Sequence, residues 1–236
     1  MFVISYIKGI VLGSTVYTIG RVADHTISYK SYQELDKKKP VLLEEGIKAC
    51  QTNLLLIGPF VYTFIDVFLL SHNTTFYVLD SVGIIFIHGV GYYIAHRLMH
   101  TNKYLYGIHT FHHKFDDILV PSIGNAVSIQ EFFIAYILPF IIGAVILKPS
   151  ELAFNIGIGF ISFFNLVIHC MELEKINYAN YLVSPKKHII HHRVKEKHYA
   201  APILDLDYIL DNLAFQRNQP VENILIPNDE LLIIDE

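Results

Sequence analysis

The stretch HRLMHTNKYLYGIHTFHH, residues 96–113, is unusually dense in histidine. It contains five of the thirteen histidines in the chain: His96, His100, His109, His112 and His113. Side chains three or four positions apart share a face of a helix, so these imidazoles can converge in pairs. A related spacing recurs in HIIHH, residues 188–192. A single histidine of this kind usually caps a helix or lies in a polar loop, but two such clusters predict one shared metal site.

The ligand type narrows the choice of metal. Neutral imidazole is the commonest metal-binding side chain, and several imidazoles without thiolates favour zinc, iron or copper over magnesium or calcium. Cys50 and Cys170 are the only cysteines, too few for a disulfide framework or a cysteine-based zinc site.

The composition indicates a membrane protein. Hydrophobic residues make up 53% of the 236 residues and the mean hydropathy is +0.40, whereas soluble domains have about 45 to 50% apolar residues. The formal charge is −4 and no basic tract is present, so nothing in the sequence favours nucleic-acid binding.

Apolar runs place the membrane segments. Residues 54–70 and 76–95 form one pair and residues 132–147 and 152–168 another, each near the roughly 20 residues that a bilayer core requires. We therefore expect an all-α integral membrane bundle of about four transmembrane helices arranged as two hairpins. Residues 2–20 are also apolar, and either a further membrane helix or an interfacial segment fits them.

The chain divides into three expected parts. Residues 1–51 comprise the N-terminal apolar segment and a polar, solvated connector, which contains a short amphipathic helix at 40–50. Residues 52–216 form the membrane domain, and residues 217–236 form an acidic C-terminal tail.

Positive charges predict the orientation. Segments 21–51, 96–131 and 170–236 carry nearly all the Lys and Arg residues, and these residues favour the cytoplasmic side of a bilayer. The histidine clusters lie in or beside the same segments, and His169 follows the last apolar run at the depth of His96. We therefore expect a cytosolic, histidine-rich helical cap.

These motifs carry a family resemblance. The order HxxxH, HxxHH and HxxHH resembles the fatty acid hydroxylase and sterol desaturase superfamily of integral-membrane non-haem diiron oxygenases. HRLMHTNKYLYGIHTFHHKF looks like the first two boxes of that family, and SPKKHIIHHRVKEKHYAAPILDLDYIL looks like the third box of its C-4 methylsterol oxidase branch. The resemblance covers about residues 50–212.

The resemblance implies a site. It implies two iron ions, which zinc can replace in purified protein, and O₂ as co-substrate. The implied ligands are His96, His100, His109, His112, His113, His169, His188, His191 and His192. No separate acid, base or nucleophile is implied, and Glu131 and Asp207 are the residues that we expect to orient ligand imidazoles.

Three positions depart from the family pattern. Ser128 stands where methylsterol oxidases have a histidine that often binds metal, although the acid at Glu131 is kept. His198 replaces an asparagine and Leu206 a tryptophan. Two interpretations follow from the missing ligand at Ser128. Either His198 completes the metal site as an additional ligand, or the site binds metal less tightly.

The resemblance also implies an activity and partners. It implies a lipid hydroxylase or desaturase of the endoplasmic reticulum membrane, with a sterol as the first expected substrate and a fatty acyl chain as the alternative. No dinucleotide-binding glycine pattern is present, so electrons are expected from cytochrome b5 and its NAD(P)H reductase. A basic docking patch, or equally a loop near anionic headgroups, comprises Lys186, Lys187, Arg193, Lys195 and Lys197.

Two other classes fit some of these observations. A metal-binding or metal-transporting membrane protein would place ionisable residues along the middle of its spans, where only His88 is found. A degenerate family member that regulates an active partner would explain Ser128 and the missing tryptophan.

Overall fold

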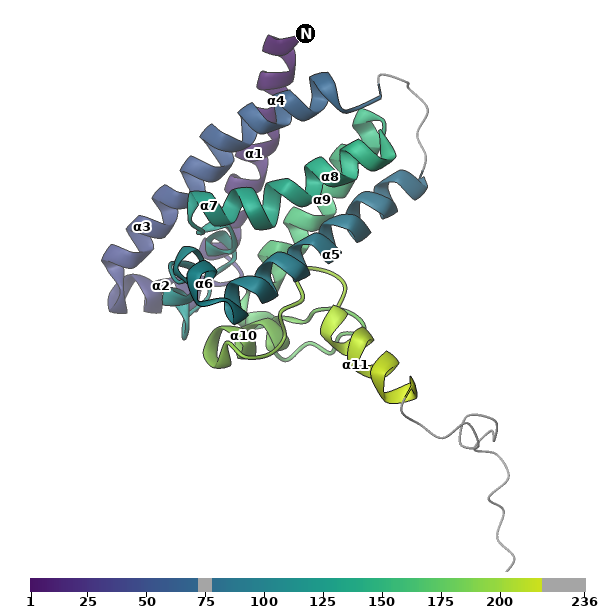
Figure 1. Ribbon diagram of the computed structural model, residues 1–236. Coiled ribbons are helices and arrows are strands. Elements are labelled where there is room, and N and C mark those ends of the chain that lie inside the picture. Colours follow the sequence, from purple (N-terminus) through teal and green to yellow (C-terminus); the bar gives the residue numbers. More distant parts are fainter. Residues whose placement is uncertain (72–77, 218–236) are drawn as a thin grey trace, which may run out of the picture.

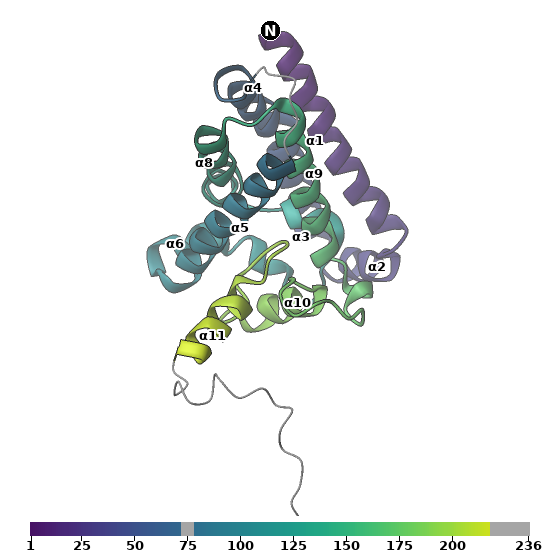
Figure 2. The same ribbon diagram turned by 90° about the vertical axis from the view of Figure 1, so that its right-hand side faces the viewer.

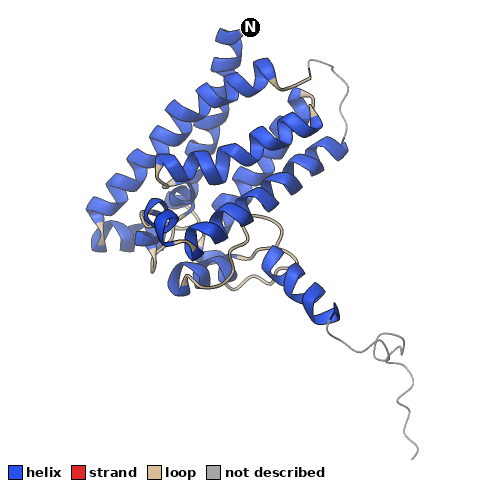
Figure 3. Cartoon of the chain, viewed as in Figure 1, coloured by secondary structure: helices blue, strands red, loops and turns tan. Residues whose placement is uncertain are grey.

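The computed structural model describes residues 1–71 and 78–217, and the regular elements within these ranges are all helices. Figure 1 shows long helices in one bundle with shorter helices gathered at one end. Figure 3 shows only loops between the described helices. The predicted all-α class is confirmed for this part of the chain. The predicted acidic tail, 217–236, lies outside the described residues except for its first position.

Within the described residues, five helical segments are long and apolar enough to cross a membrane. They are α1 (Phe2–His25); α3 (Pro40–Gln51) continued by η1 (Thr52–Ile57) and α4 (Gly58–Phe68); α5 (Val78–Thr101); α7 (Ile129–Glu131) continued by η4 (Phe132–Ile137) and α8 (Leu138–Leu147); and α9 (Glu151–Ile168). The chain is therefore an integral membrane protein with one more candidate span than the expected four. The additional span is α1.

Small residues allow α1 to pack closely against the bundle. A Cβ at Gly9 would lie 2.8 Å from the Cα of Pro59, and one at Gly13 would overlap the carbonyl oxygen of Leu54. Such glycine-to-backbone packing is typical of membrane helices, which gain little from apolar contact alone. Lys8 interrupts the apolar run, and its Nζ lies 2.7 Å from the carboxylate of Glu151. A hydropathy profile does not report contacts between helices. The sequence therefore could not decide whether residues 2–20 form a membrane helix or an interfacial segment.

Two π-helical segments interrupt the long helices, each just before a proline. η1 ends two residues before Pro59 and η4 ends two residues before Pro139. Proline has no N–H, and its ring displaces the carbonyl four residues earlier. The backbone therefore widens locally to hydrogen bonds that span five residues.

The expected solvated connector is largely helical. α1 extends to His25, α2 spans Tyr29–Lys38, and the predicted helix at 40–50 corresponds to α3, which runs on into α4. The turn before α2 is fixed by Glu172, whose carboxylate accepts hydrogen bonds from the hydroxyls of Ser28 and Ser31. These long-range contacts convert a polar stretch into an ordered part of the bundle.

Short elements close one end of the bundle. They are α6 (Lys103–His109), η2 (His112–Phe115), η3 (Pro121–Asn125), η5 (Met171–Leu173), α10 (Pro185–Val194) and α11 (Leu206–Arg217). Figures 1 and 2 both show α6 and α10 at the same end as α2. This end corresponds to the predicted histidine-rich cap.

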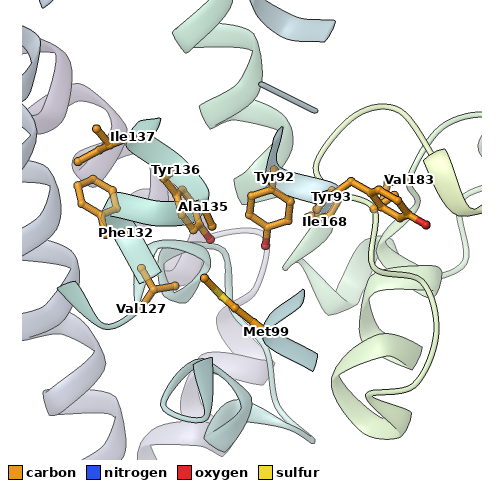
Figure 4. Packing of buried hydrophobic residues seen from close by; sticks show 12 residues of the cluster. Tyr92, Tyr93, Met99, Val127, Phe132, Ala135, Tyr136, Ile137, Ile168 and Val183 are labelled. Atoms are coloured by element: carbon orange, nitrogen blue, oxygen red, sulfur yellow. The ribbon is translucent and has the colours of Figure 1, made fainter. Parts of the chain in front are cut away.

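A buried apolar cluster joins this cap to the membrane helices. Tyr92 and Met99 of α5 pack with Phe132 and Tyr136 of η4 and with Ile168 at the end of α9, as Figure 4 shows. The cluster fixes α5 against α9, so His96 and His169 face the same region from different helices.

Candidate metal centre

Five elements bring histidines together at the closed end. α5 contributes His96 and His100 from its last two turns, α6 ends with His109, and η2 begins with His112 and His113. His169 directly follows α9, and α10 carries His188, His191 and His192.

Helix caps set the directions of these segments. The side chain of Asn102 caps α6 by accepting a hydrogen bond from the Tyr104 amide at 2.9 Å, so the chain folds back after α5 and His109 returns to His96. The side chain of Ser184 caps α10 in the same way, and Pro185 occupies the first helical turn.

The histidines form two groups, each with one ring nitrogen per residue within 4.8 Å of the others. The five-histidine group is His96, His100, His109, His113 and His191; the four-histidine group is His112, His169, His188 and His192. The groups adjoin each other, because the ring centroids of His113 and His192 are 4.8 Å apart. All nine histidines that the resemblance implies as ligands therefore lie in one group or the other.

In the five-histidine group the Nε2 atoms face one another. The Nε2 of His109 is 3.0 Å from those of His96 and His100, and the Nε2 of His96 is 3.1 Å from that of His191. Two nitrogens that bind one ion at about 2.1 Å and at right angles lie about 3.0 Å apart. The observed spacing thus matches a shared ion.

Hydrogen bonds on the other ring nitrogen leave the Nε2 atoms of His96 and His191 without protons. The Nδ1 of His96 is 2.7 Å from the carbonyl oxygen of Tyr199, and the Nδ1 of His191 is 2.8 Å from that of Lys197. A carbonyl only accepts, so both Nδ1 atoms donate, and each neutral ring then presents a bare Nε2. Burial lowers the pKa of His191 to about 3, which keeps it neutral. Two lone pairs 3.1 Å apart repel unless a cation lies between them.

Glu131 orients a third ligand candidate. The Nδ1 of His109 lies 2.7 Å from its Oε1, and both side chains are buried. Metal-binding histidines commonly donate their second N–H to a carboxylate or a carbonyl. The carboxylate also adds a negative charge beside a cation site, which is the arrangement that the sequence suggested for this residue.

The four-histidine group is held differently. The Nε2 of His188 lies 3.0 Å from that of His169 and 3.2 Å from that of His192. The Nδ1 of His169 donates a hydrogen bond to the carbonyl of Asn165 at 2.7 Å, and His112 has at most a weak interaction with the backbone of Ala126. The Nδ1 atoms of His188 and His192 are buried without a hydrogen-bond partner among the described residues.

The local electrostatics favour neutral ligands. Burial, reinforced by the neighbouring imidazoles, holds the pKa of His188 and His192 well below the usual value. Burial lowers the pKa of His169 to about 4. Neutral imidazole is the form that binds metal, so the residues present fit a pair of transition-metal ions with nitrogen ligands.

Three residues singled out from the sequence have other positions. His198 lies in neither group and has a left-handed backbone with φ 60°. Asp207 lies near His198 but makes no hydrogen bond with a grouped histidine in the described part of the chain. Its Oδ2 accepts a hydrogen bond from the Ala200 amide and so secures the loop that contains Tyr199. Ser128 caps α7, accepting from the Glu131 amide and donating to the Ile108 carbonyl.

Sequence reasoning missed the backbone acceptors that orient the imidazoles. The carbonyls of Tyr199, Lys197 and Asn165 perform this role. Any residue type supplies a carbonyl, so no signal could identify the first two. Asn165 gives a weak sequence signal, because it is a polar residue within an apolar run. Its side-chain amide donates a hydrogen bond to the carbonyl of Gly124.

Comparison with known proteins adds one match. A family model described as fatty acid hydroxylase matches residues 81–212, which is more than half of the 236-residue chain. The matched region begins in α5, ends in α11 and includes all nine histidines of the two groups. No curated protein and no solved structure matches the chain.

Proposed function

The chain belongs to the fatty acid hydroxylase family, and from this we propose that it is a membrane-bound non-haem diiron oxygenase that hydroxylates or desaturates a lipid. The family supports a membrane lipid hydroxylase or desaturase in general. The observation that carries the proposal is the pair of adjoining histidine groups, in which Nε2 atoms face one another at 3.0 to 3.1 Å in the five-histidine group and at 3.0 to 3.4 Å in the four-histidine group.

The proposed chemistry divides between metal and protein. An unactivated C–H bond resists acid-base chemistry, and iron with open coordination positions would supply the oxidising power, with O₂ as co-substrate. All nine grouped histidines would hold the ions. Glu131 and the backbone carbonyls would fix the proton on Nδ1 in four of these rings, those of His96, His109, His169 and His191, and the surrounding burial would exclude water.

The substrate would reach the site from the membrane. The histidines lie where α5 and α9 end, so a lipid can approach without leaving the apolar phase. Resemblance to the methylsterol oxidase branch makes a sterol the first candidate and a fatty acyl chain the second.

We also propose the cellular arrangement. The excess of Lys and Arg at the histidine end supports a cytosolic orientation, and the family resemblance supports the endoplasmic reticulum. Electrons would come from cytochrome b5 and its NAD(P)H reductase. Arg193 and Lys195, at the C-terminal end of α10, are the basic residues that we expect to contact an acidic carrier.

The two other classes are less well supported. A transport path needs ionisable groups along the spans, but the histidine groups gather at one end of the bundle. Degeneracy was suggested by Ser128, yet this residue caps α7 and thereby positions Glu131 beside His109.

Lipid profiling tests the activity. Cells expressing the chain with an iron supply should accumulate a hydroxylated or desaturated lipid, and His112→Ala should abolish it. His25→Ala, which removes an exposed histidine outside both groups, is the matched control and should retain the product. An unchanged profile across sterols and acyl lipids would overturn the proposed reaction and favour a regulatory role.

A further inference from the structure

A mostly apolar cavity of about 120 Å³ lies within the membrane helices. Its lining includes Gly13 of α1, Leu54 of η1, Tyr136 of η4, Tyr92 of α5 and Asn165 of α9. Asn165 connects it to the metal centre, because its carbonyl accepts the hydrogen bond from His169. This volume is somewhat smaller than the roughly 150 Å³ of an engineered cavity that binds benzene, so it would hold only a small part of a lipid, and the remainder would extend beyond it.

His88 is the exceptional residue of this lining. Its side chain is only 1% exposed, and neither ring nitrogen has a well-formed hydrogen bond with a described residue. The Tyr136 backbone offers at most a weak interaction, which still leaves one nitrogen free. An unpaired polar group in an apolar interior costs roughly 1 to 3 kcal/mol. Within a membrane span, such a residue is by default a candidate functional residue.

Two other elements that line the cavity depart from regular α-helix. The two π-helical segments both line the cavity, through Leu54 in η1 and Tyr136 in η4. Single π-helical turns occur frequently at functional sites. The ring of His88 packs against Phe140, with centroids 4.3 Å apart, so its position is fixed from the side of α8.

His88 stands at a defined separation from the metal centre. It precedes His96 by eight residues on α5, which corresponds to about 12 Å along the helix axis. Tyr92 lies between them, and its ring centroid is 6.3 Å from that of His88 and 5.1 Å from that of His96. A group bound at His88 would therefore lie well away from the carbon that reacts.

We propose that this cavity binds the lipid substrate and that His88 recognises a neutral hydroxyl group on the buried part of that lipid. The inference rests on the proposed function and adds a constraint to it. A hydroxyl satisfies the ring whichever nitrogen carries the proton, because it both donates and accepts. A charged headgroup is excluded, since ionic groups are costly at this depth.

The constraint distinguishes possible products. In a sterol the carbon that bears the hydroxyl is bonded to C-4. A hydroxyl bound at His88 would therefore keep C-4 about 12 Å from the histidine groups, measured along α5. The opposite end of the sterol would then face the metal centre. In a long-chain alcohol the reacting carbon is likewise remote from the oxygen. Oxidation remote from the hydroxyl is expected in both cases.

Binding of matched probes tests this role without turnover. Zinc-loaded protein in detergent is titrated with cholesterol and with hexadecanol, and with cholestane and hexadecane, which lack the hydroxyl; zinc has no redox chemistry. In His88→Leu, the preference for the hydroxylated member of a pair should fall about tenfold, as expected for one lost hydrogen bond. His88→Gln should restore most of it, and His25→Leu should leave it unchanged.

The outcomes separate this inference from the proposed function. A lost preference for cholesterol alone, or for hexadecanol alone, identifies a sterol or a chain lipid as the occupant. An unchanged preference in His88→Leu, or no binding of any probe, overturns the cavity assignment. The metal content of His88→Leu and the lipid profile of wild-type cells report on the oxygenase proposal independently.

Discussion

At the residue scale, the site depends on which ring nitrogen of each histidine carries the proton. His96 and His191 donate through Nδ1 to carbonyls, and His109 donates to Glu131. The sequence could predict the histidines, because ligand spacing and family motifs are properties of residue type. It could also suggest Glu131. It could not predict the carbonyl acceptors, because their positions depend on the folded loops after α10.

Removing the charge of Glu131 should weaken metal binding. In Glu131→Gln the amide still reaches His109 but no longer offers a negative charge, and loss of such a partner typically costs 10- to 100-fold in metal affinity. Competition with a chelator measures this affinity for the ion of the five-histidine group, which includes His109. Glu45→Gln, at an exposed position, should have no effect, and equal affinities for the two variants would contradict the role of Glu131.

Acidification should destabilise the metal-free protein. All four members of the four-histidine group have lowered pKa values: His112, His169, His188 and His192. In the unfolded chain they take up protons below about pH 6.5, whereas the folded site stays neutral, so stability falls as the pH decreases through that value. At one pH unit below that value, each of these histidines lowers the free energy of unfolding by up to about 1.4 kcal/mol.

Denaturation midpoints of metal-free protein in detergent test this pH dependence. The midpoint at pH 5.5 should be clearly lower than the midpoint at pH 7.5. A midpoint that is equal or higher at pH 5.5 would show that these histidines are not buried in the neutral form.

At the element scale, α1 packs so closely against η1 that a side chain at Gly13 should be destabilising. Gly13→Ala places a Cβ against the Leu54 carbonyl, so the thermal midpoint in detergent should drop by several degrees. Gly159→Ala in α9 is the matched control, because nothing lies within 4 Å of its added Cβ, and there alanine should be neutral or stabilising. Equal midpoints for the two variants would contradict the packing of α1.

The elements were only partly predictable. Apolar runs gave the four central helices, since hydropathy reports burial in lipid. The prolines at positions 59 and 139 were visible, but the π-helical turns before them depend on the packing around each bend. α2 was missed because its polar composition conceals the contacts of Ser28 and Ser31 with Glu172.

At the scale of the whole molecule, the orientation is testable with single cysteines. Replacing Lys37 and Lys186 places labels at the histidine end, and replacing Lys148 places one at the opposite hairpin tip; all three positions are exposed. In sealed endoplasmic reticulum vesicles, an impermeant maleimide added outside should label the first two and not the third. The reverse pattern would contradict a cytosolic metal centre. Cys50 and Cys170 are buried and should give little background.

The whole-molecule arrangement was predicted in outline. The sequence placed the histidines at one end of a helical bundle, and they do lie there as two adjoining groups. It could not assign each histidine to a group, because neighbours in the sequence separate: His112 joins one group and His113 the other. Nor could it show that His198 lies outside both.

The central claim is that each chain holds two metal ions, one per histidine group. Metal analysis of iron-loaded, detergent-purified protein tests it most directly when applied to three proteins: wild type, His191→Ala in the five-histidine group and His192→Ala in the four-histidine group. About two ions per chain are expected in wild type and about one in each variant. Fewer than one ion in wild type, or undiminished metal in both variants, would contradict a two-metal centre.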